Sequence, residues 1–454
     1  MKHIKRVLAV VLVAVIAFTA SRCYHRFQER GFDLLGMFLD WADRTKCSLR
    51  NFVDSAQDTI AGWPGITGGE VEWQAETALP GFSADANRFE TDALAETDRY
   101  QYNALSQSEK EMYRAVVAGI RKGETVVKTV DYQVDTGALF HVYRAVVTDH
   151  PEFFFLAKSF LYTIMPSGKA GKLILLYSDG ETSDQYDKKG ELTASADRKT
   201  IERQITLFSE RIARLRAKVR TETDLWGIEK QLHDLVIDEV AYDEEAESKL
   251  ETAEADKTHA FDAYGAACEG KAVCEGYTKL FQYLCGCYGI NCTTVSGTSD
   301  GAGHMWNAVQ LNGNWTMVDV TWNDAEKDDL RYYRYFNRTE KEMRNDHEVT
   351  EVTLAVPECT SEEGAFFRRF AFDADTKDEA PGNYKEVLDR LAAGEDRFVC
   401  LKVSGSENEI SRYINEQIFD SRSKVQRYIK SAGYGIRFSE KTYATDSYYY
   451  LMLD

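Results

Sequence analysis

The sequence has few of the features that mark a disordered or repetitive chain. Its 454 residues include only six prolines, with no low-complexity tract and no internal repeat. Hydrophobic residues make up 44% of the chain and aromatic residues 12%. A chain of this length and composition can bury more than one core. We therefore expect most of it to be folded, with polar linkers between the units.

Basic residues are also scarce relative to acidic ones. Lys and Arg total 55 against 74 Asp and Glu, giving a formal net charge of -19, and the acidic residues are spread along the chain. Such a field repels phosphate backbones, so no nucleic-acid partner is expected. Cationic peptides or a cationic surface would be attracted, although solubility is the commoner reason for acidity of this kind.

An uncharged apolar run, VLAVVLVAVIAFTAS, follows three basic residues near the N-terminus and ends at Arg22. A basic flank before an apolar stretch is typical of an export signal. As a helix the run spans about 22 Å, less than the roughly 30 Å of a bilayer core, which favours a cleaved signal. The run lacks an A-x-A cleavage site, so a membrane anchor is the alternative. We expect residues 1–22 to be a signal peptide or anchor, and the rest to be extracytoplasmic, either secreted or anchored at the cell surface by a single span.

The spacing of apolar residues divides the following part of the chain. A helical period between Phe32 and Ile60 predicts an amphipathic helical segment over residues 23–66, and a polar acidic stretch predicts a linker over residues 67–99. Residues 100–195 are expected to form an N-terminal accessory α/β unit. Its predicted elements are helices near Ser106–Lys122, with Ser108 as N-cap, and Thr136–Thr148, then strands Phe153–Met165 and Lys172–Tyr177.

Two further helices are predicted before the motifs that carry chemistry, over Asp197–Val219 and Asp224–Tyr242. After those motifs, residues 373–383 are expected to be a linker and residues 384–454 a small C-terminal α/β unit. The predicted elements of this unit are helix Tyr384–Ala393, strand Phe398–Val403, a helical stretch Ile410–Ala432, and strands that end near Leu453.

Cys274 lies at the start of a predicted helix. Within the segment Gly270–Gly289 the residues Tyr277, Leu280, Phe281, Leu284 and Tyr288 follow the spacing of one buried helix face. Cys274 is on the same face in the first turn. There the free amides and the positive end of the helix dipole stabilise a thiolate and can help to hold an oxyanion. A buried, inert cysteine is the alternative.

A predicted β-hairpin follows, with His304 on its first strand and Asp319 on its second. Asn312-Gly313 is typical of a two-residue type I′ turn, which pairs Leu311 with Asn314. With strands continuing to Trp322, His304 is opposite Thr321 and Asp319 is opposite Trp306. His304 and Asp319 are then diagonal neighbours on one face, about 7 to 8 Å apart and within side-chain reach. The glycine-rich Gly301-Ala302-Gly303 predicts a flexible approach to His304.

These elements supply what thiol acyl transfer requires. A thiolate attacks the carbonyl carbon, an imidazole manages the proton, and a carboxylate fixes the tautomer of the imidazole. The hairpin places the last two side chains on adjacent strands, and the helix supplies the sulfur. Trp306, between them, is a candidate to line a substrate groove, and simple packing is its alternative.

The order of ACEGKAVCEGYTKLFQYLCGCYGI and GHMWNAVQLNGNWTMVDVTWND resembles bacterial transglutaminase-like domains, including those similar to cytokinesis-associated transglutaminase/protease-like proteins. IDEVAYD, HAFDAYGA, and RYFNRTEKEM with the later His347 extend the resemblance from about Asp197 to Ala371. The resemblance implies an α+β fold over residues 196–372, a papain-like transglutaminase core in which the nucleophile helix packs on an antiparallel sheet. It also implies that Cys274 is the nucleophile, His304 the base and Asp319 its partner.

The nine cysteines leave at least one free thiol or an intermolecular bridge in an exported protein. Cys285, Cys287 and Cys292 are close enough in sequence to suggest a zinc site, but the spacing lacks a clear fourth ligand, and packing or a disulfide is favoured. Cys268 and Cys274 are too far apart to form a C-x-x-C redox motif. No metal or organic cofactor is expected.

The sequence thus predicts a cysteine-dependent acyl-transfer enzyme, transglutaminase-like or a peptidase, acting outside the cytoplasm on peptide or glutamine amides. Its expected partner is a protein or peptide substrate, with cell-wall peptide as one candidate, and the membrane if the N-terminal segment is retained. The alternative is a cell-envelope binding or scaffold module with a transglutaminase-like fold and weak or no activity.

Overall fold

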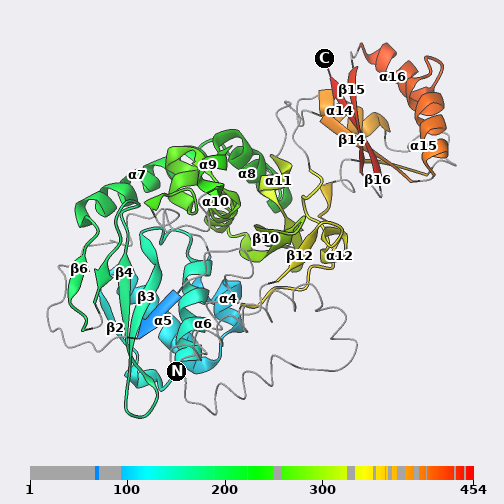
Figure 1. The fold of residues 1–454 in the computed structure, drawn as a ribbon. Coiled ribbons are helices and arrows are strands. Elements are labelled where there is room, and N and C mark those ends of the chain that lie inside the picture. The colour runs from blue at the N-terminus through cyan, green and yellow to red at the C-terminus, as the bar shows by residue number, and fades with distance from the viewer. Residues whose placement is uncertain are drawn as a thin grey trace, which may run out of the picture. The chain divides into compact units, whose positions relative to one another are not determined.

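The computed structural model describes most of the chain after residue 93 (Figure 1). The described residues are 67–70, 94–187, 189–221, 223–248, 257–324, 333–350, 354–362, 364–366, 371–375, 384–392, 398–404, 406–433, 436–443 and 446–453. All of them belong to one unit, residues 61–454. The signal or anchor over 1–22, the helical segment over 23–66, and Cys23 and Cys47 lie outside the described residues.

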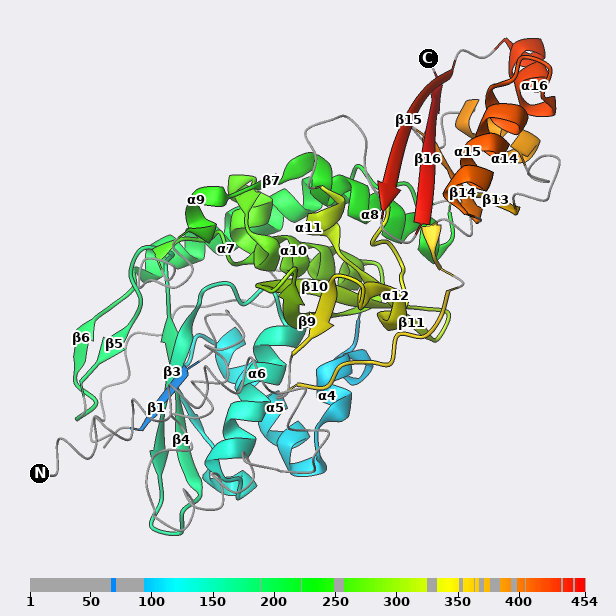
Figure 2. The same cartoon turned by 45° about the vertical axis from the view of Figure 1, so that its right-hand side comes forward.

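The accessory part consists of a four-stranded sheet and helices that pack on it (Figure 2). The strand order is β1-β3-β4-β2. Rings of Phe140 and Tyr143 on α6 meet Phe160 on β3 at centroid distances of 4.8 and 4.5 Å. The elements are β1 (Thr67–Glu70), α4 (Tyr100–Ala104), α5 (Gln107–Arg121), β2 (Val126–Lys128), α6 (Thr136–Asp149), β3 (Leu156–Ile164) and β4 (Ala170–Tyr177).

The predicted helices and strands of this part are confirmed, with two corrections. Ser106, and not Ser108, caps α5, because Ser106 and Glu109 form a capping box. The predicted linker contains β1, which pairs in parallel with β3. An acidic, glycine-containing stretch gives no period from which so short a strand could be predicted. A small hairpin, β5 (Gln185–Tyr186) with β6 (Leu192–Ala194), follows β4.

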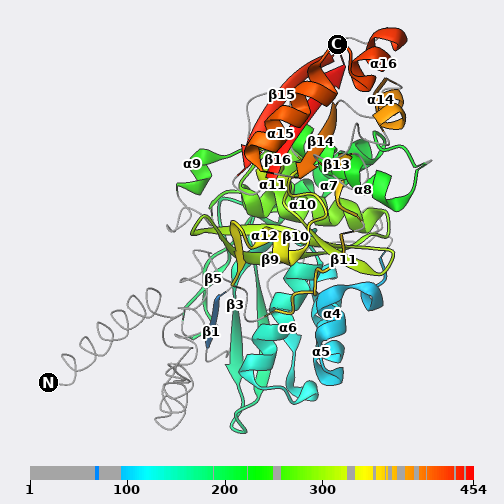
Figure 3. The same cartoon turned by 90° about the vertical axis from the view of Figure 1, so that its right-hand side faces the viewer.

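The central part packs helices on an antiparallel sheet of order β11-β10-β9-β12. Helix α10 lies against β9 and β10 (Figure 3), and the predicted α+β class is confirmed. Asp197 and Asp224 cap the predicted helices α7 and α8 with their side chains. The elements are α7 (Arg198–Arg216), α8 (Leu225–Glu239), β7 (Ala241–Tyr242), α9 (Glu244–Glu247), a π-helical turn (Gly265–Glu269), β8 (Lys271–Ala272), α10 (Cys274–Cys287), β9 (Asn291–Ser299), β10 (Ala302–Leu311), β11 (Asn314–Val318), α11 (Val320–Asn323), α12 (Glu340–Met343) and β12 (His347–Val349).

The hairpin register predicted from Asn312-Gly313 is confirmed. Leu311 pairs with Asn314, and Asn307 with Val318. Both turn residues have positive φ, 51° and 84°, as a type I′ turn requires.

The predicted second strand is too long. It ends at Val318, because Asp319 turns its carboxylate to the amide of Trp322 and begins α11. The glycine-rich approach to His304 is also corrected. Ala302 and Gly303 are the first residues of β10, paired with Ser299 and Thr298 of β9.

The C-terminal part is an α/β unit with a sheet of order β13-β14-β16-β15. Its predicted helices and strands are confirmed, except that the predicted helical stretch Ile410–Ala432 is interrupted between Phe419 and Lys424. The predicted linker over residues 373–383 is corrected at its start, because Ala371–Asp375 is a strand parallel to β14. The elements are β13 (Ala371–Asp375), α14 (Tyr384–Ala392), β14 (Phe398–Ser404), α15 (Glu407–Tyr413), a π-helical turn (Ile414–Phe419), α16 (Lys424–Ala432), β15 (Ile436–Tyr443) and β16 (Asp446–Leu453).

Among the described residues, no helix combines the length and the apolar character needed to span a membrane.

Candidate active site

Cys274 is the first residue of α10, as the sequence predicts, and only 5% of its surface is exposed. Side chains of the facing elements fix this helix on β10. The Thr278 hydroxyl donates to the carbonyl of Met305 at 3.1 Å, and the Asn307 amide donates to the carbonyl of Thr278 at 3.1 Å. The first turn of α10 is therefore held against the strand that carries His304.

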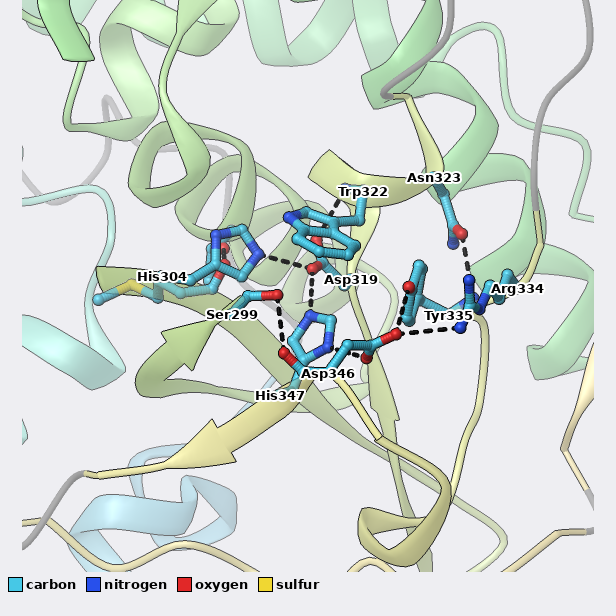
Figure 4. Close-up of polar contacts among 11 residues, drawn as sticks. Ser299, His304, Asp319, Trp322, Asn323, Arg334, Tyr335, Asp346 and His347 are labelled. Atoms are coloured by element: carbon cyan, nitrogen blue, oxygen red, sulfur yellow. Dashed lines mark hydrogen bonds and ion pairs between the residues drawn. The ribbon is translucent and has the colours of Figure 1, made fainter. Parts of the chain in front are cut away.

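His304 and Asp319 meet, as the hairpin predicts, although Asp319 is no longer part of a strand. The Nε2 atom of His304 lies 2.6 Å from Oδ2 of Asp319, and both side chains are buried (Figure 4). Burial alone would lower the pKa of His304, but the Asp319 carboxylate and then the Cys274 thiol raise it to about 10. The imidazolium form is thus favoured.

The Cys274 thiol is a neighbour of His304 and contributes to the rise of its pKa. Because Nε2 of His304 faces Asp319, Nδ1 is the nitrogen left to face the sulfur. The structure therefore brings the three predicted residues into one neighbourhood, in which His304 contacts Asp319 and lies near Cys274.

The carboxylate of Asp319 is fixed from both sides. The carboxylate oxygen Oδ1 accepts from the backbone amide of Trp322 at 3.0 Å. The backbone N–H of Asp319 donates to the carbonyl of Tyr335 at 2.9 Å. Burial would raise the pKa of Asp319, but the His304 and His347 side chains hold it well below its usual value. Asp319 is therefore ionised in its buried position.

His347 occupies a place in this site for which the sequence reasoning gave no role. It begins β12, is 3% exposed, and its Nε2 lies 2.9 Å from Oδ2 of Asp319. It is 43 residues after His304 in the sequence and reaches the site because β12 pairs with β9. The sequence indicates it only through the family resemblance, which includes His347 without giving it a role.

Tyr242 is a second neighbour of the thiol that the sequence reasoning did not single out. Burial and then the nearby Cys274 raise the pKa of Tyr242 above its usual range, so its hydroxyl stays protonated. It comes from β7, which pairs with β8 just before Cys274. The Glu247 carboxylate adds to the same rise.

The groove-lining prediction for Trp306 is corrected. Its side chain is fully buried, and its ring packs on His347 and His304 at centroid distances of 5.1 and 6.0 Å. Packing, the alternative, is what the structure shows. An inward-facing position on β10 gives the indole no access to a substrate.

His304, Asp319 and His347 also have the spacing of a metal-binding group, with one donor atom from each within 4.8 Å of the others. However, the two nitrogen–oxygen distances of 2.6 and 2.9 Å are hydrogen-bond lengths. Two ligands of one tetrahedral zinc ion are about 3.3 Å apart at normal bond lengths. The distances are therefore those of two imidazoles hydrogen-bonded to the Asp319 carboxylate.

The cysteines suggested as a zinc site pack in the core. Cys285, Cys287 and Cys292 are buried and form no disulfide. Burial and then the hydrogen bond with Cys292 raise the pKa of Cys285 well above its usual value, so this thiol stays neutral. Among the described residues, these three cysteines do not form a group whose donor atoms are close enough together to hold a metal ion.

Comparison with known proteins supports the fold reading. Residues 213–320 match the model of the transglutaminase-like superfamily. The kyphoscoliosis peptidase of Mus musculus is 40% identical over 67 residues, which cover 12% of this chain and 10% of the peptidase. That of Homo sapiens is 39% identical over 72 residues, covering 13% and 11%. The chain thus spans about a tenth of the length of these relatives.

A solved structure described as a crystal structure of a TGase is 18% identical, with a TM-score of 0.24, and covers 40% of this chain and 48% of its own. A likeness of this size adds no argument to the family match. The match spans α8, the nucleophile helix and the hairpin with His304. This chain therefore contains a transglutaminase-like domain.

Proposed function

We propose that this chain is a cysteine-dependent acyl-transfer enzyme that acts on peptide or glutamine amides. Cys274 is the nucleophile, His304 the general base and acid, and Asp319 the residue that orients His304. The observation that supports the proposal is the buried contact of His304 with the Asp319 carboxylate at 2.6 Å, close enough to Cys274 for the thiol to raise the pKa of His304.

In the proposed reaction the sulfur of Cys274 attacks the amide carbonyl carbon and forms a C–S bond. His304 holds the proton of the thiol and gives it to the leaving nitrogen as the C–N bond breaks. The product is a thioester. Water or a primary amine then attacks this thioester, His304 accepts its proton, and the thiol is released.

The buried site supports this assignment. Asp319 is shielded from water, so its attraction for the imidazolium is not screened by salt. The first turn of α10 places backbone amides near the sulfur, where they can stabilise a thiolate or an oxyanion. Protein or peptide substrates fit this class of domain. Water as acceptor gives a peptidase, and an amine gives a cross-linking transferase.

The place of action proposed is outside the cytoplasm, with the chain secreted or anchored at the cell surface, and cell-wall peptides are candidate substrates. This part of the proposal rests on the basic flank and apolar run of residues 1–22. Fusion of residues 1–30 to a reporter enzyme that is active only after export would test it. A reporter that remains cytoplasmic contradicts it.

Alkylation by iodoacetamide tests the thiol chemistry. We expect Cys274 to react below about pH 8, faster than the other thiols, and to lose this advantage in His304→Ala. Cys268 is an internal comparison, because burial raises its pKa to about 12. His141→Ala, which removes a half-buried histidine of the accessory part, is the matched control.

Equal and slow labelling of Cys274 and Cys268 would favour the alternative of a scaffold with weak or no activity. If Cys274 is activated, wild type and Cys274→Ser are incubated with candidate proteins or cell-wall peptides and an added primary amine. Mass spectrometry then distinguishes a hydrolysed product from an amine adduct. A product that forms equally with Cys274→Ser contradicts the proposal.

A further inference from the structure

Both ring nitrogens of His347 face a carboxylate. Nδ1 lies 2.6 Å from Oδ1 of Asp346, and Nε2 lies 2.9 Å from Oδ2 of Asp319. A neutral imidazole has one N–H and one lone pair, so one of the two carboxylates would face a lone pair. Only the imidazolium donates to both. The contacts therefore require His347 to be a cation.

Asp346 is itself anchored. Its second oxygen, Oδ2, accepts from the Tyr335 hydroxyl at 2.8 Å and from the Arg334 guanidinium at 3.0 Å (Figure 4). Burial would raise the pKa of Asp346, but the hydrogen bonds from His347 and Tyr335 hold it below its usual value. The carboxylate beside Nδ1 of His347 is thus both fixed and negatively charged.

The surroundings of His347 leave these charges unscreened. Its charged and titratable neighbours are Asp319 after β11, His304 on β10, Asp346, and Tyr335 with Arg334 from the segment between α11 and α12. The rings of Trp306, Trp322 and Tyr335 surround it at centroid distances of 5.1, 5.0 and 5.0 Å. Positive and negative side chains alternate in a series of contacts, in the order Arg334, Asp346, His347, Asp319 and His304.

The two imidazoles compete for one oxygen. His304 and His347 both approach Oδ2 of Asp319, and their ring centroids are 5.6 Å apart. Burial would lower the pKa of His347, but Asp319 and Asp346 raise it, and the charge of His304 opposes that rise. The same repulsion acts on His304. A cationic His347 therefore disfavours the cationic form of His304.

This opposition matters for a general acid. An imidazole held by a buried carboxylate alone keeps its proton too strongly, whereas proton transfer is most efficient when the pKa is near the working pH. We propose that His347, held by Asp346, is a positioning residue that fixes Asp319 between two imidazoles and, through its positive charge, weakens the hold of Asp319 on the His304 proton. This inference rests on the function proposed above, because only acyl transfer requires His304 to release that proton.

Titration of ¹³Cε1-labelled histidines by NMR tests the inference in the full chain. The spectra are recorded in Cys274→Ser, where the thiol no longer raises the pKa of His304, and signals are assigned by substitution. We expect His347 to titrate above the ordinary value of about 6.5, because Asp319 and Asp346 raise its pKa. In His347→Gln, which retains an amide donor toward Asp319 but has no charge, the midpoint of His304 should rise by about one pH unit.

His150→Gln is the matched control, since it removes another buried histidine that is paired with a carboxylate, 2.8 Å from Glu152. It should leave the midpoint of His304 unchanged. Asp346→Asn is a milder second variant, in which His347 loses the charge that keeps it protonated. We expect His347 to titrate lower in this variant and His304 higher.

The inference is overturned if His347 titrates at or below about pH 6.5 in the parent protein. It is also overturned if the midpoint of His304 is unchanged in His347→Gln or, should that variant fail to fold, in Asp346→Asn. Iodoacetamide labelling of Cys274 in wild type separates the two failures. An activated Cys274 with an unchanged His304 midpoint overturns this inference alone. A shifted midpoint with an inert Cys274 overturns the proposed function, and with it the catalytic purpose of His347.

Discussion

At the scale of single residues, the site depends on one carboxylate. Asp319 accepts from the amide of Trp322 through Oδ1 and from His304 and His347 through Oδ2. Three donors on a fully buried group leave it little freedom to rotate. A change at this position therefore alters the orientation and the protonation of His304 together.

Asp319→Asn should lower the reactivity of Cys274 strongly while leaving the fold in place. An amide has only one acceptor oxygen, so its NH2 group would face either the Trp322 amide or the two imidazoles. It also has no charge, so the pKa of His304 falls from about 10 toward its ordinary range. We expect alkylation of Cys274 near neutral pH to slow by at least ~10-fold. The matched control, Asp197→Asn, changes an exposed helix cap to an equally good one and should have no effect. Unchanged alkylation in Asp319→Asn would contradict the role of Asp319.

Glu229 is a buried acid outside the site, and it makes stability depend on pH. Its Oε2 accepts from the Asn337 amide at 2.8 Å, but burial raises its pKa to about 8. The contribution of protonated Glu229 to stability is fully present below the pKa of a glutamate in the unfolded chain, about 4.3. This contribution is lost as the pH rises through the folded-state pKa of about 8.

Glu229→Gln should therefore flatten the pH profile of stability. Between about pH 4.3 and pH 8 the wild type should lose unfolding free energy that the variant retains. Thermal unfolding at pH 5 and pH 8 measures this difference. Glu210→Gln, at an exposed i,i+4 pair with Arg214, is the control and should follow the wild type. A variant with the same slope as the wild type would show that Glu229 is ionised in the folded protein.

At the scale of elements, much of the site follows from local patterns. The helical period places Cys274 at the start of α10, and Asn312-Gly313 sets the register that brings His304 near Asp319. What the patterns miss depends on distant partners. The turn of Asp319 into α11 follows from its cap on Trp322 and from a backbone bond to Tyr335.

The sequence patterns also did not predict strand β9 or the strand β12 that pairs with it. Asp300-Gly301, with φ values of 47° and 81°, is a second two-residue turn of the kind recognised at Asn312-Gly313, and it joins β9 to β10. β12 pairs with β9 from a position that local sequence does not indicate. The role of His347 could therefore not be derived before the pairing was known. The roles of the three predicted residues and the domain boundaries remain predictions.

Gly297 allows the approach of β12 to β9. A Cβ atom there would lie 2.1 Å from the carbonyl oxygen of Glu348 and 2.6 Å from the ring of Trp306. Gly297→Ala should push β12 outward, move His347 from Asp319, and raise the midpoint of His304. NMR titration and alkylation of Cys274 measure both effects. Gly137→Ala, whose Cβ would meet only an atom 3.4 Å away, is the control and should behave as wild type. Normal titration in Gly297→Ala would show that β12 adjusts without moving His347.

At the scale of the whole described unit, the accessory part shares its core with the transglutaminase-like domain. Buried residues of α5, α6 and β4 belong to the same hydrophobic cluster as those of α7, α8 and α10. Polar contacts cross the same boundary. Gln282, on the nucleophile helix, donates to the carbonyl of Thr148 at 2.7 Å. The accessory part therefore supports the helix that carries Cys274.

Gln101 tests this support. Its amide donates to the hydroxyl of Thr293 on β9 at 3.1 Å and to the carbonyl of Ala355 at 2.9 Å, and the side chain is 1% exposed. Gln101→Met retains the size but leaves both acceptors without this donor, which should cost about 1–3 kcal/mol of unfolding free energy. Gln107→Met, at an exposed position, should cost little.

Because the two parts share one core, denaturant should unfold them together in wild type, and the variant should shift this single transition to lower denaturant. Circular dichroism reports the loss of helices, and alkylation of Cys292, which is buried on β9, reports the opening of the central sheet. Coincident curves from both measurements are expected, since a cooperative unit has one transition for every probe. If the helices melt first while Cys292 stays protected, the accessory part is an independent domain, and its contacts with α10 and β9 do not stabilise the site.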